Sequence, residues 1–393
     1  MVEHVRSAAS PLSVQVIQPI VPHYRVPFFE GVAKRNELRV RLCVSHTISG
    51  MPPSLPVRGM NVDTRHYCHE MLGGRVLWQR DLTLEPSLGH GDVLVIDGNP
   101  RFLSNIPLLI EARRRGVAIV WWGHGWSATS APLRARIRLR MMRLADVVLL
   151  YTDAERDDLI ARGFDPARVF ALNNAVDETR IADAARAWTP GRLSLFRAEQ
   201  GLDGRRVLLF CGRLRETPST ELHVALRALL PLVARSPSYL LVVIGDGPSA
   251  GELRKLADEL GVANHVRWLG AIYDEEQLAP WFLSAHCFVY PGPIGLSLIQ
   301  AFGYGLPVVT HDNRLAHNPE IAALVEGVTG MMFPRADAGA LARCVDTLCT
   351  DDALRSRMAH AARRIVEEKY SMKSMVLRFT QTVVAASRRI SER

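Results

Sequence analysis

The sequence lacks any apolar run long enough to cross a membrane. A spanning helix needs roughly 20 mostly apolar residues, and no stretch of the 393 residues reaches that length. The first residues, "MVEHVRSAASPLS", also lack the long apolar region of a secretory signal. We therefore expect a cytoplasmic protein.

The chain is also poor in patterns that bind metals or nucleic acid. Its six cysteines are scattered and form no Cys-x-x-Cys pair, so free buried thiols are expected rather than zinc ligands. The net charge of +8 suits anionic partners, although an arginine-rich proteome explains it equally well. No RNA-recognition motif accompanies the charge, so no nucleic-acid partner is expected.

What the sequence does contain is a regular alternation of short β-branched strands and helical patterns. This alternation predicts parallel sheets covered by helices on both faces, and the length favours two domains. The predicted fold class is α/β, with two Rossmann-like, doubly wound domains facing a cleft. The strands are expected at residues 12–18, 38–45, 92–98, 117–125, 146–152 and 168–177, and then at 205–213, 239–248, 266–270, 287–292 and 306–312.

The alternation loosens across residues 184–204, which are the best candidate for a linker. We place the N-terminal domain at 1–190 and the C-terminal domain at 191–370. Residues 371–393 form an amphipathic helix expected to pack back on the N-terminal domain. In doubly wound sheets ligands bind at the carboxyl ends of the strands, so functional residues should follow them.

Two strand-end loops of the second half carry glycine beside a polar residue. Gly212 and Arg213 follow one strand, and Gly245 and Asp246 follow the next. Glycine allows a ligand close to the backbone, and arginine can bind a diphosphate with two parallel hydrogen bonds. Each loop by itself could equally be an ordinary turn.

The stretch "PGPIGLSLIQAFGYG" adds a third loop, which opens a helix. The amides of Gly295, Leu296 and Ser297 would lie at the helix N-terminus, where partial positive charge binds phosphate without a lysine. Three such loops in one domain indicate a nucleotide diphosphate site.

At this point "FCGRL", "LLVVIGDGP", "FVYPGPIGLSLIQAFGYGLPVVTHDN" and "ARRIVEEKYS" resemble the second half of the retaining glycosyltransferases of family four, which have the GT-B fold. The likeness runs over residues 205–385. "PHYRVPFFEGVAKR", "WWGHG", "LADVVLLYT" and "ALNNAVD" resemble, more loosely, a bacterial polysaccharide-building branch of that family.

The resemblance implies that the C-terminal domain (191–370) binds a UDP- or GDP-sugar donor and that the N-terminal domain (1–190) binds the acceptor. It also implies retention at the anomeric carbon and no obligatory metal or cofactor. Two departures stand out. Relatives keep Lys-Gly on the diphosphate where this chain has Pro218 and Ser219, and a Glu-x7-Glu motif where it has Gly292 and Gln300. Gln300 can still accept a hydrogen bond from a ribose hydroxyl.

Other residues must then supply the missing donor contacts. Arg215 is a candidate substitute for the lysine, and the alternative is a solvated arginine. The polar segment 310–320 follows a strand and is either a donor-sugar site or an ordinary polar loop. Its candidate residues are His311, Asp312, Asn313 and Glu320.

In the first half, "WWGHGW" places His124 after a strand and between two glycines. We predict that His124 and Arg213 are the catalytic residues, with His124 hydrogen-bonded to a hydroxyl group or the anomeric oxygen of the transferred sugar. The alternative is a buried structural histidine. The neighbouring tryptophans (Trp121, Trp122 and Trp126) offer faces suited to sugar rings. The predicted acceptor contacts are His23, Arg25, Asp97, Asn99 and Trp126.

Residues 132–146 predict a basic amphipathic helix. Leu133, Ile137, Met141 and Leu144 share one face, and five arginines surround it. Such helices dock on anionic membranes, which suits a lipid-linked acceptor and peripheral attachment to the inner face of the cell membrane. The alternative is a helix packed on the core with a solvated basic face. The five arginines are Arg134, Arg136, Arg138, Arg140 and Arg143.

The function that these observations favour is sugar transfer from a nucleotide diphosphate to a saccharide, plausibly lipid-linked, in polysaccharide or glycoconjugate biosynthesis. Two alternatives stay open: a nucleotide-sugar 2-epimerase of the same fold, and a catalytically silent partner subunit. The lost lysine and glutamates motivate the second alternative.

Overall fold

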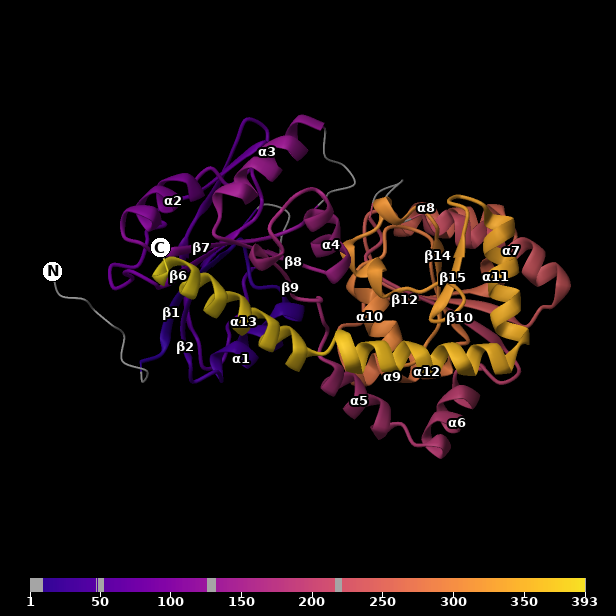
Figure 1. Ribbon diagram of the computed structural model, residues 1–393. Coiled ribbons are helices and arrows are strands. Elements are labelled where there is room, and N and C mark those ends of the chain that lie inside the picture. Colours follow the sequence, from indigo (N-terminus) through magenta and orange to yellow (C-terminus); the bar gives the residue numbers. More distant parts are fainter. Residues whose placement is uncertain (1–9, 47, 49–52, 126–131, 216–220, 393) are drawn as a thin grey trace. The chain divides into compact units, whose positions relative to one another are not determined.

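The computed structural model describes residues 10–46, 48, 53–125, 132–215 and 221–392. The chain forms two compact units (Figure 1). The first comprises Met1–Asn174 with Met372–Arg393, and the second comprises Ala175–Ser371. Each unit is an α/β body around a parallel sheet.

The first unit contains a seven-stranded sheet in the order β3-β2-β1-β6-β7-β8-β9. All pairs are parallel, and Val14 of β1 lies between Val40 of β2 and Val93 of β6. A separate antiparallel hairpin joins β4 to β5. The strands are β1 Leu12–Gln18, β2 Leu38–Ser45, β3 Asn61–His66, β4 Cys68–Met71, β5 Val76–Gln79, β6 Val93–Asp97, β7 Ala118–Trp122, β8 Val147–Leu150 and β9 Val169–Ala171.

The C-terminal helix α13 belongs to the first unit, where Figure 1 shows it in yellow beside α1. Phe379 of α13 contacts the rings of Phe28 and Trp122 edge-on or tilted, and Arg378 pairs with Asp153 at 2.8 Å. The helices of this unit are η1 His23–Arg25, α1 Val26–Ala33, α2 Asn105–Arg114, α3 Pro132–Leu144, α4 Asp153–Ala161, η2 Pro166–Arg168 and α13 Met372–Ser391.

The second unit contains a six-stranded parallel sheet in the order β12-β11-β10-β13-β14-β15. Its strands are β10 Arg206–Cys211, β11 Tyr239–Ile244, β12 Val266–Gly270, β13 Cys287–Tyr290, β14 Val308–His311 and β15 Gly330–Phe333. Its helices are α5 Glu178–Ala187, α6 Pro190–Glu199, α7 Leu222–Arg235, α8 Ala250–Glu259, η3 Ala263–His265, α9 Glu275–Ser284, α10 Leu296–Gly303, η4 Arg314–Ala316, η5 Pro319–Ala323, α11 Ala338–Thr350 and α12 Asp352–Lys369.

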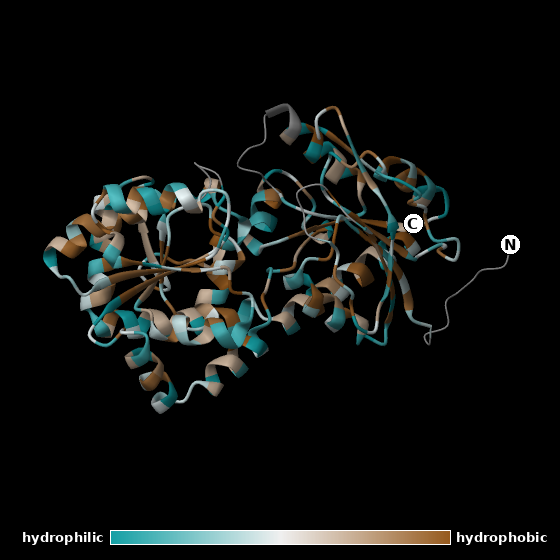
Figure 2. Cartoon of the chain, turned by 180° about the vertical axis from the view of Figure 1, so that it is seen from behind, coloured by the Kyte–Doolittle hydropathy of each residue, from teal (hydrophilic) through white to brown (hydrophobic). Residues whose placement is uncertain are grey.

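The strands are apolar on both faces because helices cover both sides of each sheet, and Figure 2 shows them in brown inside each unit. In the second unit, alternate residues of β10 serve two cores. Leu208 and Phe210 join the core with α7 and α11, whereas Val207 and Leu209 join the core with α9 and α10. The doubly wound architecture expected from the sequence is therefore present in both units.

The boundary between the units falls earlier than residue 190, at Asn174 and Ala175. The expected linker over 184–204 is largely helical, because it contains the end of α5 and the whole of α6. Thr189 caps α6 by accepting a hydrogen bond from the Arg192 amide, and Pro190 occupies the first turn. Among the described residues, no helix is long and apolar enough to span a membrane.

Candidate functional sites

The first unit has its topological switch point between β1 and β6, since the chain proceeds from β1 toward β3 and from β6 toward β9 in opposite directions. Ligands of doubly wound sheets bind outside the carboxyl ends of the strands at such a point. Here the structure places His23 and Arg25 after β1, and Asp97 at the last position of β6. Three of the predicted acceptor residues thus come from the two strands that flank the switch point.

A cluster of aromatic rings surrounds Arg25 at this edge. The guanidinium carbon lies 5.1 Å from the centre of the Trp122 ring and 5.4 Å from that of Tyr151. The Tyr151 ring in turn lies 4.5 Å from the His124 ring. Loops after β1, β7 and β8 therefore converge. Arg25, Tyr151 and His124 keep part of their surface exposed and are groups of the kind that bind sugars.

Glu155 holds two of these loops in place, and the sequence alone did not single it out. Its side chain is buried. Oε1 accepts a hydrogen bond from the Gly125 amide at 2.8 Å, and Oε2 accepts one from the Tyr151 amide at 3.0 Å. Because one carboxylate joins the two loops, the positions of His124 and Tyr151 are coupled.

His124 is neutral at physiological pH. Protein atoms crowd the ring, although part of the residue stays exposed. This burial, with the positive charges of Arg138 and Arg25, lowers the pKa of His124 to about 4. A neutral imidazole has one donor and one acceptor nitrogen, so it can hydrogen-bond a sugar hydroxyl or a glycosidic oxygen.

Asp97 is a second residue at this edge of the sheet whose side chain has a shifted pKa. Its Oδ2 is buried and has no hydrogen-bond partner among the described residues. Burial raises the pKa of Asp97 to about 7. Asn99 accepts a hydrogen bond from the Arg101 amide at 3.1 Å, which shapes the loop after β6. A carboxyl group with one unpartnered oxygen at a switch point is a candidate for binding a hydroxyl group.

We expect Asp97 to make stability depend on pH. Between pH about 4 and 7 the unfolded chain has released this proton while the native Asp97 keeps it, so raising the pH through this window destabilises the native state. Asp97→Asn should remove about 2 kcal/mol of that pH dependence, a figure reduced from the full shift because the residue is half-buried. Urea denaturation at pH 5 and pH 8 measures the free energy of unfolding. An equal loss of stability between these pH values in wild type and variant would contradict the prediction.

Trp121 and Trp122 do not offer faces to a sugar, contrary to the expectation from "WWGHGW". Both are 1% exposed. They lie on a central strand that is covered on both sides, and Trp122 contacts Phe28, Phe29 and Phe379. Trp126 lies outside the described residues.

The second unit has its switch point between β10 and β13. The loops that end β10, β11 and β12 are joined by backbone hydrogen bonds. The Gly212 amide donates to Ile244 O at 2.9 Å, the Leu214 amide to Asp246 O at 3.0 Å, and the Gly245 amide to Gly270 O at 2.7 Å. The three loops therefore form one ledge at the carboxyl edge of the sheet.

Close packing explains the glycines of this ledge better than open access for a ligand does. A Cβ on Gly245 would lie 1.9 Å from Gly212 O, and one on Gly247 would lie 2.1 Å from Leu214 O. A Cβ on Gly212 would meet the Tyr290 ring at 2.9 Å. These positions require glycine to bring the loops together, whereas Asp246 is exposed at the surface.

The predicted phosphate-binding groups lie at this edge. The side chains of Arg213 and Arg215 are exposed after β10. Gly295 is the N-cap of α10, and the Leu296 and Ser297 amides belong to its first turn, where helix geometry leaves amides without intrahelical partners. Pro218 and Ser219 lie outside the described residues.

The side chains of the segment after β14 mainly contact one another and neighbouring backbone. The His311 ring is fully buried and stacks on the His317 ring, with centres 3.8 Å apart. His317 accepts a hydrogen bond from the Ile294 amide at 3.1 Å, and its other nitrogen lies 2.9 Å from His311 O. The segment thus holds the loop that precedes α10. Glu320 is buried, and only Asp312 and Asn313 are exposed among the four predicted residues.

Gly292 is buried, and Gln300 lies on the second turn of α10. The Gln300 amide nitrogen donates to the carboxylate of Glu275, the first residue of α9. Sequence reasoning missed Glu275, because nothing local in "YDEEQL" connects it to a residue 25 positions later.

Three buried side chains in the first unit have the composition of a metal site, but neighbouring positive charges disfavour a cation there. Potential ligand atoms of Cys43, Asp63 and His66 lie within 4.8 Å of one another. Arg41 and Arg65 already pair with Asp63 at 2.8 and 2.7 Å and lower the pKa of its carboxyl group. Asp63 is the one carboxylate of the three residues, and the two guanidinium groups paired with it disfavour a bound cation.

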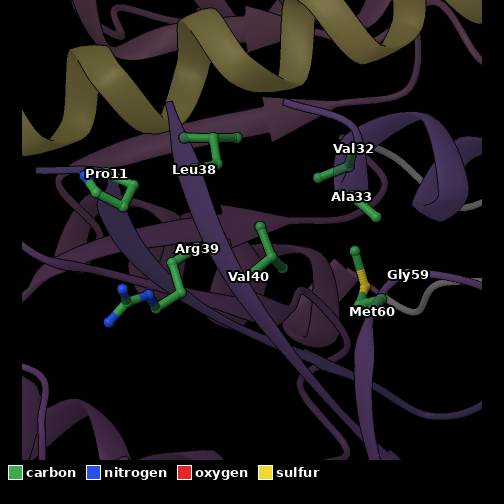
Figure 3. A pocket seen from close by; sticks show the side chains of 8 residues that line it. All are labelled: Pro11, Val32, Ala33, Leu38, Arg39, Val40, Gly59 and Met60. Carbon is green, nitrogen blue, oxygen red and sulfur yellow. The ribbon is translucent and has the colours of Figure 1, made fainter. Parts of the chain in front are cut away.

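Figure 3 shows a pocket of about 240 Å³ in the first unit. It is lined by the end of α1 and by the first residues of β2, including Leu38 and Val40. This is the amino end of the strand, and the clustered site residues lie at the opposite, carboxyl ends. We therefore do not assign the pocket to the candidate site.

Part of the second unit is similar to a known family of proteins. Residues 205–351 match the sequence model of the family described as "Glycosyl transferases group 1". The match covers β10 to the end of α11, and so includes the ledge and α10.

Curated relatives are similar over parts of their length. The α-D-kanosaminyltransferase of Streptomyces kanamyceticus is 29% identical over 59% of this chain and 58% of the relative. A GDP-mannose-dependent α-(1-6)-phosphatidylinositol monomannoside mannosyltransferase of Mycolicibacterium smegmatis is 29% identical over 65% and 67%. The lipopolysaccharide core glycosyltransferase LpsE of Rhizobium meliloti is 27% identical over 40% and 45%. The matches thus span 45–67% of these relatives.

Solved structures share the fold over nearly the whole chain. HepE of Anabaena, solved in complex with UDP, has a TM-score of 0.67 at 17% identity and covers 94% of this chain and 99% of its own. A glycosyltransferase of Rickettsia africae has a TM-score of 0.69 at 12% identity, with 95% and 98% covered. The predicted fold class is confirmed as two parallel-sheet, Rossmann-like units with GT-B glycosyltransferases as structural neighbours.

Proposed function

We propose that this protein is a retaining, metal-independent glycosyltransferase that moves a sugar from a UDP- or GDP-sugar to a saccharide acceptor. The observation that carries the proposal is the switch point of the second unit. There the exposed Arg213 and the N-terminus of α10 lie at the carboxyl edge of the sheet, within the segment that matches group 1 glycosyl transferases. A leaving diphosphate needs this kind of positive partner.

The first unit supplies the proposed acceptor side and the catalytic histidine. Asp97, Arg25 and neutral His124 lie at the ends of neighbouring strands, where they can bind sugar hydroxyl groups. Because Arg213 and helix amides would stabilise the diphosphate, no metal ion is required. Acceptor deprotonation is assigned to the leaving phosphate, and Asp97 is assigned a binding role.

The test is a donor screen by mass spectrometry with a panel of UDP- and GDP-sugars. Release of UDP or GDP from one of them, unaffected by EDTA, supports transfer without a metal. An α-linked product from an α-linked donor, identified by NMR, supports retention. Conversion of the donor to its C2 epimer would favour the epimerase. Failure to bind any nucleotide in thermal-shift assays would leave only the silent subunit.

Lipid-linked acceptors motivate a second part of the proposal, in which α3 docks on an anionic membrane. On α3, Ile137 and Leu144 are exposed, Met141 is half-buried and Met142 contacts the core. Exposed arginines accompany the two apolar residues. Arg138 is the exception, since it is half-buried and acts electrostatically on His124 and Glu155. The side chains of Leu133 and Arg134 lie outside the described residues.

Helix α2 adds further exposed apolar side chains beside those of α3. Its Ile106 and Ile110 are exposed one turn apart, and Arg113 of α2 donates a hydrogen bond to the carbonyl of Leu144 at the end of α3. Two neighbouring helices thus expose apolar side chains between arginines, the pattern that binds anionic lipid surfaces.

We expect Ile137→Ser with Leu144→Ser to weaken binding to vesicles of phosphatidylglycerol about 100-fold, since each buried aliphatic side chain contributes about 1.5–3 kcal/mol. Leu195→Ser is the control, because Leu195 is more exposed than either residue but lies on α6. Vesicle co-sedimentation measures both variants. Equal binding by the two, or equal binding to phosphatidylcholine, would refute membrane docking through α3.

A further inference from the structure

Three polar side chains form a network between α9 and α10 in the second unit. The Gln300 amide nitrogen lies 3.2 and 3.3 Å from the two carboxylate oxygens of Glu275, and the Tyr304 hydroxyl donates to Glu275 Oε1 at 2.7 Å. Glu275 and Gln300 are half-buried, and Tyr304 is buried. The network therefore joins the start of α9 to the middle and end of α10.

This network fixes which atom Gln300 can offer to a ligand. An ionised carboxylate only accepts hydrogen bonds, so Glu275 selects the amide orientation in which the Gln300 nitrogen faces it. The Gln300 carbonyl oxygen then points away from Glu275, and the side-chain hydrogen bonds of Gln300 to other described residues all come from its nitrogen. Gln300 becomes a hydrogen-bond acceptor with its orientation set, which is also the role of a carboxylate oxygen.

The location of the network fits a nucleotide. Gln300 is three residues after Ser297 and so lies on the same face of α10 as the first turn. At a rise of about 1.5 Å per residue, it is about 5 Å along the helix from that turn. Helix α9, which begins at Glu275, packs against β10, since Leu278 and Ala279 of α9 lie in the same core as Leu209. A ribose attached to a diphosphate at the helix N-terminus would lie at this distance.

We propose that Glu275 is a positioning residue that orients Gln300 so that its carbonyl oxygen accepts a hydrogen bond from a ribose hydroxyl of the bound nucleotide. The assignment rests on the proposed function, because it requires a nucleoside diphosphate at α10. It explains how the unit retains a negative charge beside the ribose without a glutamate at position 300: the charge comes from α9.

The test uses the full-length protein with UDP, GDP, ADP and CDP, and then the 2′,3′-dideoxy form of whichever binds best. In Glu275→Gln the amide of Gln300 is free to turn over. We expect the affinity for the diphosphate to fall about fivefold, the value of about one hydrogen bond, and the preference for ribose over dideoxyribose to fall by the same factor. Glu276→Gln is the matched control, since Glu276 is the exposed neighbour on the same helix.

Exchanging the carboxylate and the amide between positions 275 and 300 distinguishes a role in orienting residue 300 from a role in stability alone. Gln300→Glu alone places two carboxylates side by side and should also weaken binding. The double variant Glu275→Gln with Gln300→Glu restores one carboxylate and one amide donor, and should recover affinity and ribose preference to within about threefold of wild type. Titration calorimetry measures all variants.

Glu275→Gln with the same ribose preference as Glu276→Gln would overturn the inference while leaving the proposed function intact. A double variant no better than Glu275→Gln would do the same. Wild-type protein that binds none of the four diphosphates would instead remove the proposed function, and this inference with it.

Discussion

His124→Ala is expected to lower turnover about 100-fold while changing nucleotide affinity less than threefold. Removal of one preorganised hydrogen-bonding group at a reacting centre typically has an effect of this size. The side chain lies at the carboxyl edge of the first unit, beside Tyr151 and Arg25, whereas the proposed diphosphate groups belong to the second. Steady-state kinetics with saturating donor measures turnover, and calorimetry with the nucleoside diphosphate measures affinity.

Two further variants make the His124 experiment specific. His124→Asn keeps a donor and an acceptor and should retain more activity than alanine. His69→Ala is the matched control, because His69 is exposed on the β4–β5 hairpin. Since the pKa of His124 is about 4, protonation of this residue should not reduce wild-type activity above pH about 5. Unchanged turnover in His124→Ala would remove the residue from the site.

The fold could be predicted from the sequence because its strands are short, apolar and regularly spaced. Each β-branched run followed by glycine, asparagine or aspartate corresponds to a strand whose loop lies at the carboxyl edge. The boundary was harder to predict. The loosened alternation over 184–204 suggested a linker, yet a proline in such a segment can also begin a helix. Thr189 followed by Pro190 is a helix start, and α6 begins there.

The site could be predicted to the level of the loops but not of the contacts between them. The positions of Gly212, Arg213 and His124 after strands could be predicted because their motifs are local in sequence. Glu155 and Glu275 act through hydrogen bonds to residues 25 to 30 positions away, and no local pattern encodes such a pair. Trp122 shows the converse error, in which an aromatic residue close to a motif belongs to the core.

The glycine ledge of the second unit permits the other prediction with a large effect. Gly245 has φ +147°, a conformation that residues with a side chain rarely adopt, and its Cβ position is 1.9 Å from the carbonyl oxygen of Gly212. A backbone carbonyl cannot move aside as the end of a side chain can. Gly245→Ala must therefore break the contact between the loops after β10 and β11, or lose the bond from the Gly245 amide to Gly270 O.

We expect Gly245→Ala to destabilise the second unit by at least about 4 kcal/mol, the range reached by clashes and strain at buried backbone. Gly251→Ala is the matched control, because Gly251 lies inside α8 with open space at its Cβ and should gain up to about 1 kcal/mol of stability. Thermal unfolding followed by circular dichroism compares the two. If Gly245 served only to admit the donor, its variant would keep the wild-type melting temperature and lose nucleotide binding. A large fall in melting temperature would instead establish that the glycine is needed to join the loops after β10 and β11.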